Sequence, residues 1–202
     1  MTVPNHITNI IRADQDVLDA LCVTDADGKK TVDFNTIVPM PDSIHTGSIG
    51  IERFDDPTAW RRWSIDNWGT KWNAYGQQAG QTTPGELRFE TAWSHPEPVI
   101  NALSALFPDR EIQVAYADED AGYNLGVYAL RHGHCPGHRF SRMISAAIDP
   151  GTPEAINLAH LIRTGETEAD YMRGFGDEDW SEKLDYTPLD DRYDPFDLIK
   201  EH

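Results

Sequence analysis

The chain has 202 residues, enough for one domain with an appendage or for two small domains, and its 39% hydrophobic content with six tryptophans indicates a folded protein. Its 17 basic and 34 acidic residues give a formal net charge of −17, which argues against direct binding to bare nucleic acid because phosphates need Lys and Arg. Two distant cysteines, Cys22 and Cys135, make no disulfide framework, and no apolar run reaches the roughly 18 residues that span a bilayer.

The first third of the chain shows alternating regular and irregular segments. Residues 4–13 are rich in β-branched side chains and predict a strand, and residues 14–22 carry apolar side chains at helical spacing. Asp25–Gly28 reads as a turn. Prolines and glycines make residues 33–58 irregular, after which the tryptophan spacing of residues 57–72 predicts a helix.

The middle third contains the clearest periodic pattern. Residues 86–93 alternate apolar and polar side chains, as a strand with one buried face does. Ser94 and Glu97 fit a capping box at the start of a helix. Residues 111–117 and 123–131 predict two further strands. With the first strand and helix, this order predicts an α+β, ferredoxin-like fold, a split βαβ antiparallel sheet with helices on one face.

The last third has a different character. Residues 140–148 predict a short amphipathic helix, and Thr152–Gly165 predicts another with a side-chain N-cap and a glycine stop. Residues 176–202 are acidic with scattered aromatics, and they either drape over the domain or form a tail that orders on a partner. We therefore divide the chain into a ferredoxin-like domain, residues 1–133, and a helical, acidic C-terminal extension, residues 134–202.

Several short stretches occur together in the order found in one known family. They are residues 4–9 (PNHITN), 34–41 (FNTIVPMP), 63–74 (WSIDNWGTKWNA), 89–94 (FETAWS) with Pro96, and 116–119 (YADE). On these stretches the chain resembles the YubB ferredoxin-like family of phage and plasmid proteins. The resemblance implies a ferredoxin-like domain encoded by a mobile element, but no activity and no catalytic residues. Asp120 departs from the glycine expected after the Asp-Glu pair.

The run from Asn67 to Asn73 packs two indoles, a lysine and two amides into seven residues. One interpretation is a cleft in which Lys71 contacts a ligand whose ring stacks on Trp68 or Trp72. The alternative is that the tryptophans fill the core while the polar side chains satisfy backbone groups. On the first interpretation the ligand-binding residues are His6, Asn67, Lys71, Trp72 and Asn73.

One cluster has residue types that bind soft metals. His134, Cys135 and His138 supply three candidate zinc ligands, which would make the protein a metal-stabilised scaffold. The spacing matches no recognised zinc motif, and the Pro-Gly pair inside the cluster indicates a turn. We therefore expect no cofactor, with zinc as the alternative.

The acidic charge is concentrated near the C-terminus. Residues 149–202 hold 15 acidic and 5 basic residues, a net charge of −10. Such a surface suits a basic partner, above all a host protein that itself grips nucleic acid, although solubility alone is the simpler explanation. The predicted partner-binding residues are Asp177, Glu178, Asp179, Trp180, Asp190, Asp191, Tyr193 and Phe196.

Two functional hypotheses follow from the sequence. The first is a non-catalytic protein from a phage or plasmid that inhibits a host defence system by acidic mimicry of nucleic acid. The second is a small-molecule or nucleotide-binding module centred on Trp68–Asn73, either with or without enzymatic activity. The chain shows no Gly-rich phosphate loop and no nucleophile elbow, which favours the first. The N-terminal sequence has no signal-peptide pattern, so we expect a cytoplasmic protein.

Overall fold

The structure is a computed structural model that describes residues 5–50, 55–77, 84–131, 142–145, 148–167 and 193–200. None of the helices in these ranges is long and apolar enough to cross a membrane. In chain order the elements are β1 (His6–Arg12), α1 (Gln15–Ala20), β2 (Cys22–Thr24), β3 (Lys30–Val32), the 3₁₀ helix η1 (Phe34–Thr36), α2 (Trp60–Trp68), β4 (Glu86–Ala92), α3 (Glu97–Leu106), β5 (Glu111–Asp118), β6 (Leu125–Arg131), β7 (Arg142–Ser145), α4 (Pro153–Thr164) and the 3₁₀ helix η4 (Pro195–Ile199).

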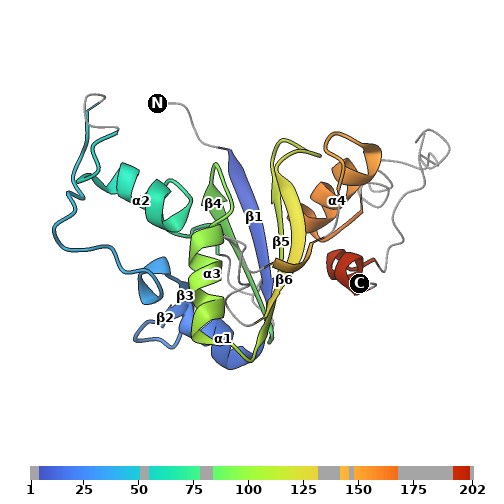
Figure 1. Ribbon diagram of the computed structural model, residues 1–202, viewed down its shortest axis with the longest axis horizontal. Coiled ribbons are helices and arrows are strands. Elements are labelled where there is room, and N and C mark those ends of the chain that lie inside the picture. The colour runs from blue at the N-terminus through green and yellow to red at the C-terminus, as the bar shows by residue number, and fades with distance from the viewer. Residues whose placement is uncertain are drawn as a thin grey trace.

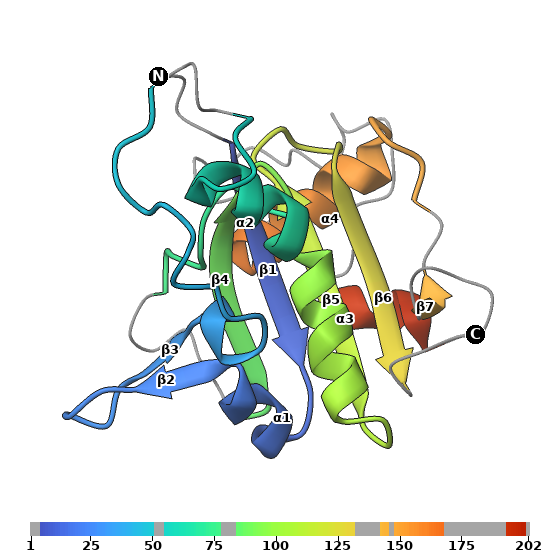
Figure 2. The same ribbon diagram turned by 60° about the vertical axis from the view of Figure 1, so that its left-hand side comes forward.

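The main sheet has the order β4-β1-β5-β6-β7, with all neighbouring strands antiparallel (Figure 2). Because β4 and β5 both run antiparallel to the strand between them, they are parallel to each other, and α3 joins them across β1. This is the split βαβ arrangement that the sequence predicts. The register places Ile11 of β1 opposite Leu87 of β4 and Val114 of β5, so the apolar side chains of three strands share one face.

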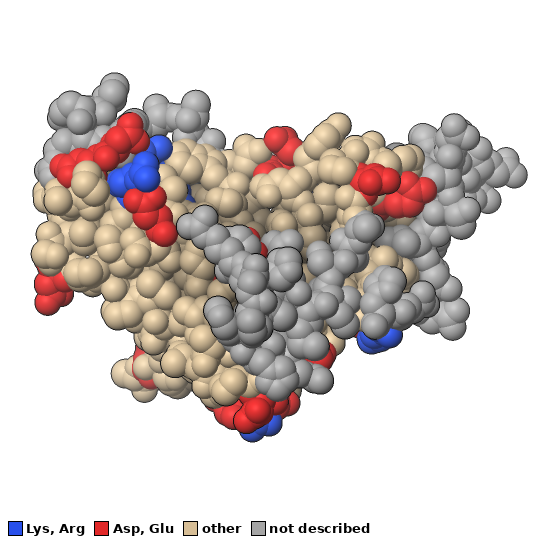
Figure 3. All heavy atoms as spheres, in the orientation of Figure 1, with Lys and Arg blue, Asp and Glu red and all other residues tan. Residues whose placement is uncertain are grey.

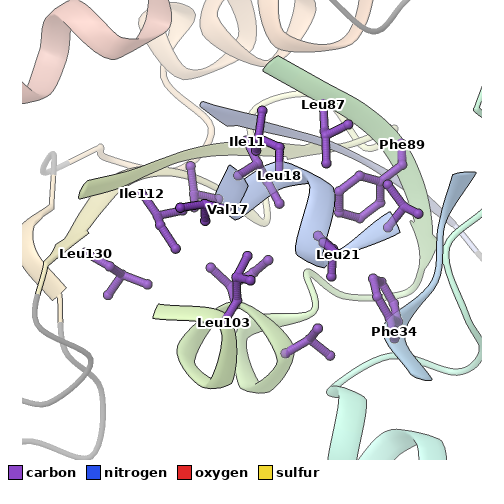
Figure 4. Close-up of a cluster of buried hydrophobic side chains, with 14 of the residues drawn as sticks. Ile11, Val17, Leu18, Leu21, Phe34, Leu87, Phe89, Leu103, Ile112 and Leu130 are labelled. Carbon is purple, nitrogen blue, oxygen red and sulfur yellow. The ribbon is translucent and has the colours of Figure 1, made fainter. Parts of the chain in front are cut away.

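That face forms the larger hydrophobic core, under α1 and α3 (Figure 2). Val17 and Leu18 of α1 and Leu103 of α3 are fully buried against the sheet. Figure 4 shows Leu103 pointing from its helix toward the strands. Phe34 of η1 closes one end of the core. The alternation in β4 and the helical spacing in α3 therefore place the apolar residues as the sequence pattern predicts.

The opposite face of the sheet is also covered, by α4 and η4 (Figure 1). Ala115, Ala117 and Ala129 line this face, and such small side chains let a helix approach the strands closely. The N-cap of α4 is as predicted, with the Thr152 hydroxyl accepting from the amide of Ala155 at 3.2 Å. The division of the chain at residue 133 stays a prediction, but the described parts of the C-terminal region complete the core of the same sheet.

The middle region contains the predicted helix as α2, but its predicted end and the predicted cap of the next helix are wrong. The helix expected over residues 57–72 ends at Trp68, because Gly69 adopts a left-handed conformation with φ +78°. A Cβ at Gly69 would also lie 2.7 Å from Cδ of Pro98. The positive φ and this close contact both exclude a side chain at this position. The capping box at α3 does not form: the Ser94 hydroxyl donates instead to the carbonyl of Gly69 at 2.7 Å. Tertiary contact between the two segments thus outweighs the local capping motif.

The segment 140–148 also differs from its predicted helix. Residues 142–145 form β7, which pairs antiparallel with β6 and extends the sheet. Four residues carry too little periodicity to separate a helix from a strand, and pairing with β6 decides the outcome. Elsewhere, the predicted turn Asp25–Gly28 is confirmed, and it joins the short hairpin strands β2 and β3, which the sequence pattern did not reveal.

Candidate functional site

The candidate site is built where the segment after α2 is fastened along the edge strand β4. The Thr70 hydroxyl donates to the carbonyl of Ala92 at 2.7 Å and accepts from the amide of the same residue at 3.1 Å. Further along, Tyr75 and Glu90 exchange two backbone hydrogen bonds, at 3.0 and 2.8 Å. The Gly-Thr-Lys-Trp-Asn run is therefore held as an extra edge to the sheet, which fixes Lys71 beside the end of β4.

Lys71 lies between two indole rings at this edge. Its Nζ is 4.3 Å from the ring centroid of Trp72 and 4.5 Å from that of Trp93. The guanidinium carbon of Arg61 is 5.4 Å from the same Trp93 ring centroid. All four side chains are partly exposed. We call Arg61, Lys71, Trp72 and Trp93 the cation–tryptophan ridge, in which each cation contacts the face of a ring.

The ridge is locally positive in an acidic protein. Among the residues that the structure describes, no carboxylate forms an ion pair with Lys71. Burial lowers the pKa of Lys71, and the positive charge of Arg61 adds to this effect. Arg61 forms an ion pair with Asp55, at 3.9 Å. In Figure 3, Lys and Arg gather with Asp and Glu over α2. An anion near Lys71 would relieve both the desolvation and the repulsion between the two cations.

Tyr75 connects the ridge to His6. The rings of Trp72 and Tyr75 meet edge to face at 6.2 Å, and Nδ1 of His6 is 2.8 Å from the Tyr75 hydroxyl. The same hydroxyl donates to the carbonyl of Thr91 at 3.1 Å. Burial raises the pKa of Tyr75 to about 12, with help from the charge of Glu90, so the phenol stays protonated at neutral pH. His6, Trp72 and Lys71 are thus brought together, as the sequence-based hypothesis requires.

Asn67 and Asn73, the two amides of the predicted site, have structural partners instead. Asn67 donates to the carbonyl of Trp63, one turn back in α2, at 2.9 Å. Oδ1 of Asn73 accepts from the amide of Phe34 at 2.9 Å, and its Nδ2 donates to Asp33 at 2.7 Å. Burial raises the pKa of Asp33, but the hydrogen bonds to this carboxylate outweigh it and hold the pKa below its ordinary value. For these two residues the contacts favour the alternative in which the amides satisfy backbone groups.

The two tryptophans of the run also separate. Trp68 is buried in the larger core, and its indole N–H donates to the carbonyl of Val38 at 2.8 Å. Trp72 stays partly exposed beside Lys71. Only Trp72 of the pair can therefore offer a ring face to a ligand.

Sequence reasoning missed Arg61, Trp93 and Tyr75. Trp93 follows the alternating pattern of β4, and nothing in that pattern reveals its φ of +73°, which turns the indole out at the strand end. Arg61 lies in α2, away from the run, and reaches Trp93 only through the packing of that helix. Tyr75 follows the run directly, so extending the predicted segment by two residues would have included it.

Most of the predicted partner-binding residues lie outside the described residues, namely Asp177, Glu178, Asp179, Trp180, Asp190 and Asp191. The prediction for Phe196 is wrong, because its side chain is fully buried in the core under α4 and cannot anchor a partner. Tyr193 is partly exposed. The candidate zinc ligands His134, Cys135 and His138 also lie outside the described ranges, so that hypothesis stays a prediction.

Comparison with known proteins supports the fold. Residues 68–135 match a family model described as "Ferredoxin-like domain in Api92-like protein". No curated protein and no solved structure matches the chain. The matched range contains β4, α3, β5 and β6. It therefore includes β4 and β5, the two parallel strands that α3 joins in the split βαβ unit. The chain therefore contains a ferredoxin-like domain that is similar to the one in Api92-like proteins.

Proposed function

We propose that the protein is a binding protein whose ligand site is the cation–tryptophan ridge, and that its ligand is a nucleotide. The observation that carries this proposal is the placement of Lys71. It lies between two indoles, partly desolvated and without an acidic partner among the described residues, in a chain with twice as many acidic as basic residues. A phosphate would pair with Lys71 and Arg61, while a base would stack on Trp72 or Trp93.

The net charge argues for a mononucleotide rather than a polymer. Stacking on an aromatic ring contributes about 1–3 kcal/mol per base, and one phosphate needs only the two cations of the ridge. Each further phosphate of a longer nucleic acid would meet a surface dominated by Asp and Glu, where repulsion grows with every charge. The ridge therefore favours a ligand with one ring and few charges.

A titration of tryptophan fluorescence tests this proposal. We expect AMP, CMP, GMP or UMP to quench the fluorescence saturably, with an affinity that falls as salt is added because the phosphate contact is partly exposed. Lys71→Gln is expected to weaken binding by about tenfold or more, since a charge-assisted hydrogen bond contributes about 1.5–3 kcal/mol. The quenching itself should persist at saturation, because both ring faces remain.

Lys29→Gln is the matched control. Lys29 is an exposed lysine in the turn between β2 and β3, remote in sequence from the ridge, and it forms no ion pair with a described residue. The same substitution there should leave nucleotide affinity unchanged. If Lys71→Gln binds the nucleotide as tightly as the natural chain, or if none of the four nucleotides binds, the ridge is not a nucleotide site.

A second candidate function rests on a different surface, which we call the acidic rim: Glu119, Asp120, Asp149 and Glu154. The amide of Gly151 donates to the carbonyl of Gly122 at 2.8 Å and so joins the two turns that carry the rim. All four side chains are exposed, and none forms an ion pair within the described ranges. Figure 3 shows acidic side chains over α4 on this side. We propose that the rim, with the acidic residues 168–192, binds a basic host protein.

Under this second proposal the protein mimics nucleic acid and comes from a phage or plasmid. A phage or plasmid protein related to the YubB family, acting in the cytoplasm of the host, would use the rim to occupy the nucleic-acid site of a defence protein. Such a complex forms through complementary charge, so its association rate and its stability fall with ionic strength. Nucleic acid would compete for the same site on the partner.

A pull-down from host lysate at low salt, at high salt and with added duplex DNA tests this idea. We expect the natural chain to retain a nucleic-acid-binding protein at low salt, and to release it either at high salt or on addition of duplex DNA. The variant Glu119→Gln/Asp120→Asn/Asp149→Asn/Glu154→Gln should lose it. A control that removes the same charge elsewhere should keep it: Asp27→Asn/Asp42→Asn/Asp55→Asn/Asp109→Asn. Retention that ignores both DNA and the rim variant would contradict the mimicry.

A further inference from the structure

A hollow that is separate from the ridge lies between the end of α4 and the sheet. Its volume is about 260 Å³. The side chains come from β1, β4, the turn after β5 and the last turn of α4, so four segments that are distant in sequence meet there. The lining residues are His6, Thr8, Glu90, Glu119, Arg163 and Thr164. None of them belongs to the cation–tryptophan ridge.

Thr8 is the first sign that the hollow takes a ligand. The residue as a whole is only 8% exposed, and its hydroxyl forms no hydrogen bond within the part of the chain that the structure describes. Its cross-strand neighbours are Ala117 and Glu90, and the alanine offers no polar side-chain atom. The hydroxyl is not among the fully buried polar atoms that lack a partner, so it is still reached from the hollow that Thr8 lines. A polar group in the hollow would supply the missing hydrogen bond.

His6 presents a second polar atom. The Tyr75 hydroxyl donates to the carbonyl of Thr91, so it is the oxygen of Tyr75 that faces Nδ1 of His6, at 2.8 Å. This arrangement fits an imidazole with its proton on Nδ1. Oε2 of Glu90 lies 3.7 Å from the same nitrogen. Nε2 of His6 has no hydrogen-bond partner among the described residues, and it is left as an acceptor.

The charges in the hollow have both signs. Glu90 and Glu119 contribute two carboxylates, and Arg163 contributes the guanidinium. Arg163 donates one hydrogen bond to the backbone carbonyl of Glu119, at 3.3 Å, and its guanidinium has further N–H donors. Groups of opposite charge around one small space favour a ligand that also carries both charges, with its ammonium at the carboxylates and its carboxylate at the guanidinium.

We propose that this hollow binds a small zwitterion of the α-amino-acid class. The volume lies below the roughly 300–1,000 Å³ of typical pockets for drug-sized ligands, which suits a small metabolite. Glu90 and Glu119 bind the ammonium group, Arg163 binds the carboxylate, and the Thr8 hydroxyl and Nε2 of His6 bind the remaining polar atoms. This proposal does not rest on the nucleotide proposal, and the two sites share no residue.

The test is a titration of the isotope-labelled full chain with the common L-α-amino acids, followed by NMR. At least one amino acid should shift the signals of Thr8 and His6 in a saturable way. Its N-acetylated and carboxyl-amidated derivatives should not bind, because each has lost one of the two charges. The ridge tryptophans should not respond, which separates this result from that of the nucleotide titration.

Two variants and one control complete the design. Arg163→Gln is expected to weaken binding by roughly tenfold or more, as the loss of a charge-assisted hydrogen bond predicts. Thr8→Val keeps the shape of the side chain and removes only the hydroxyl, so it should weaken binding without unfolding the sheet. Arg62→Gln, which removes an exposed arginine paired with Asp66 on α2, should bind as the natural chain does. The proposal is overturned if no amino acid shifts Thr8 or His6, or if binding survives Arg163→Gln and Thr8→Val unchanged.

Discussion

Replacing Phe196 with alanine is expected to lower the free energy of unfolding by about 3–5 kcal/mol, the usual cost of truncating a buried phenylalanine. The ring is fully buried among Ile10, Val127 and Ile199 on the second face of the sheet. The guanidinium of Arg12 lies 4.3 Å from its centroid and also pairs with Asp194, the cap of η4. Truncation would leave a cavity and remove the contact that holds η4 against the sheet.

Chemical denaturation with urea measures this effect, and Leu106→Ala is the matched control. Leu106 is a large apolar residue at the end of α3, and 61% of its surface is exposed. Its truncation should cost well under 1 kcal/mol, because most of its surface already contacts water. An equal effect of the two substitutions would mean that η4 does not pack on the sheet, and it would restore Phe196 as a candidate for partner binding.

Replacing His95 with leucine is the second large effect: it is expected to lower the free energy of unfolding by about 3–5 kcal/mol. His95 lies in the core, stacked on the ring of Tyr116 at 4.4 Å, with Nδ1 2.8 Å from Oδ1 of Asn9 and Nε2 2.6 Å from the hydroxyl of Tyr128. Asn9 uses its amide nitrogen on Thr91 and on the backbone, so its oxygen faces the imidazole. Leucine would remove both of these buried hydrogen bonds, at about 1–3 kcal/mol each.

A double-mutant cycle separates this network from simple packing. Tyr128→Phe alone should lower the free energy of unfolding by about 1–3 kcal/mol, because it removes the buried hydrogen bond to Nε2 of His95. In the His95→Leu background the same change should cost little or nothing, since the tyrosine hydroxyl has already lost its acceptor. Thermal and urea unfolding of the four chains give the coupling energy. Strictly additive effects would show that His95 and Tyr128 do not depend on each other.

Local patterns predicted those parts of the fold whose structure depends on local sequence. The alternation of Leu87, Phe89 and Thr91 gave β4 its buried face. As expected, α4 begins after the Thr152 cap and ends at Gly165. Features decided by partners far along the chain were not predictable in this way. The strand β7 exists because β6 offers an edge, and Ser94 abandons its capping role because Gly69 packs against it.

The same distinction holds for the candidate site. Lys71 and Trp72 were found because they share one short run with an unusual composition. Trp93 was missed as a site residue because its backbone turns out of the strand pattern, at a φ of +73°. Phe196 was misread as a surface anchor because an aromatic ring in an acidic segment has the same local signature whether it is exposed or buried against a distant sheet.

The most direct test of the ridge as a nucleotide site is to follow the indole N–H signals of the six tryptophans by NMR while the best-binding mononucleotide is added. Trp72 and Trp93, which flank Lys71, should shift progressively and saturate together. Trp68 should not move, because its indole is buried and bonded to Val38. Shifts of Trp68 or of tryptophans outside the ridge, with Trp72 and Trp93 unchanged, would contradict the proposal.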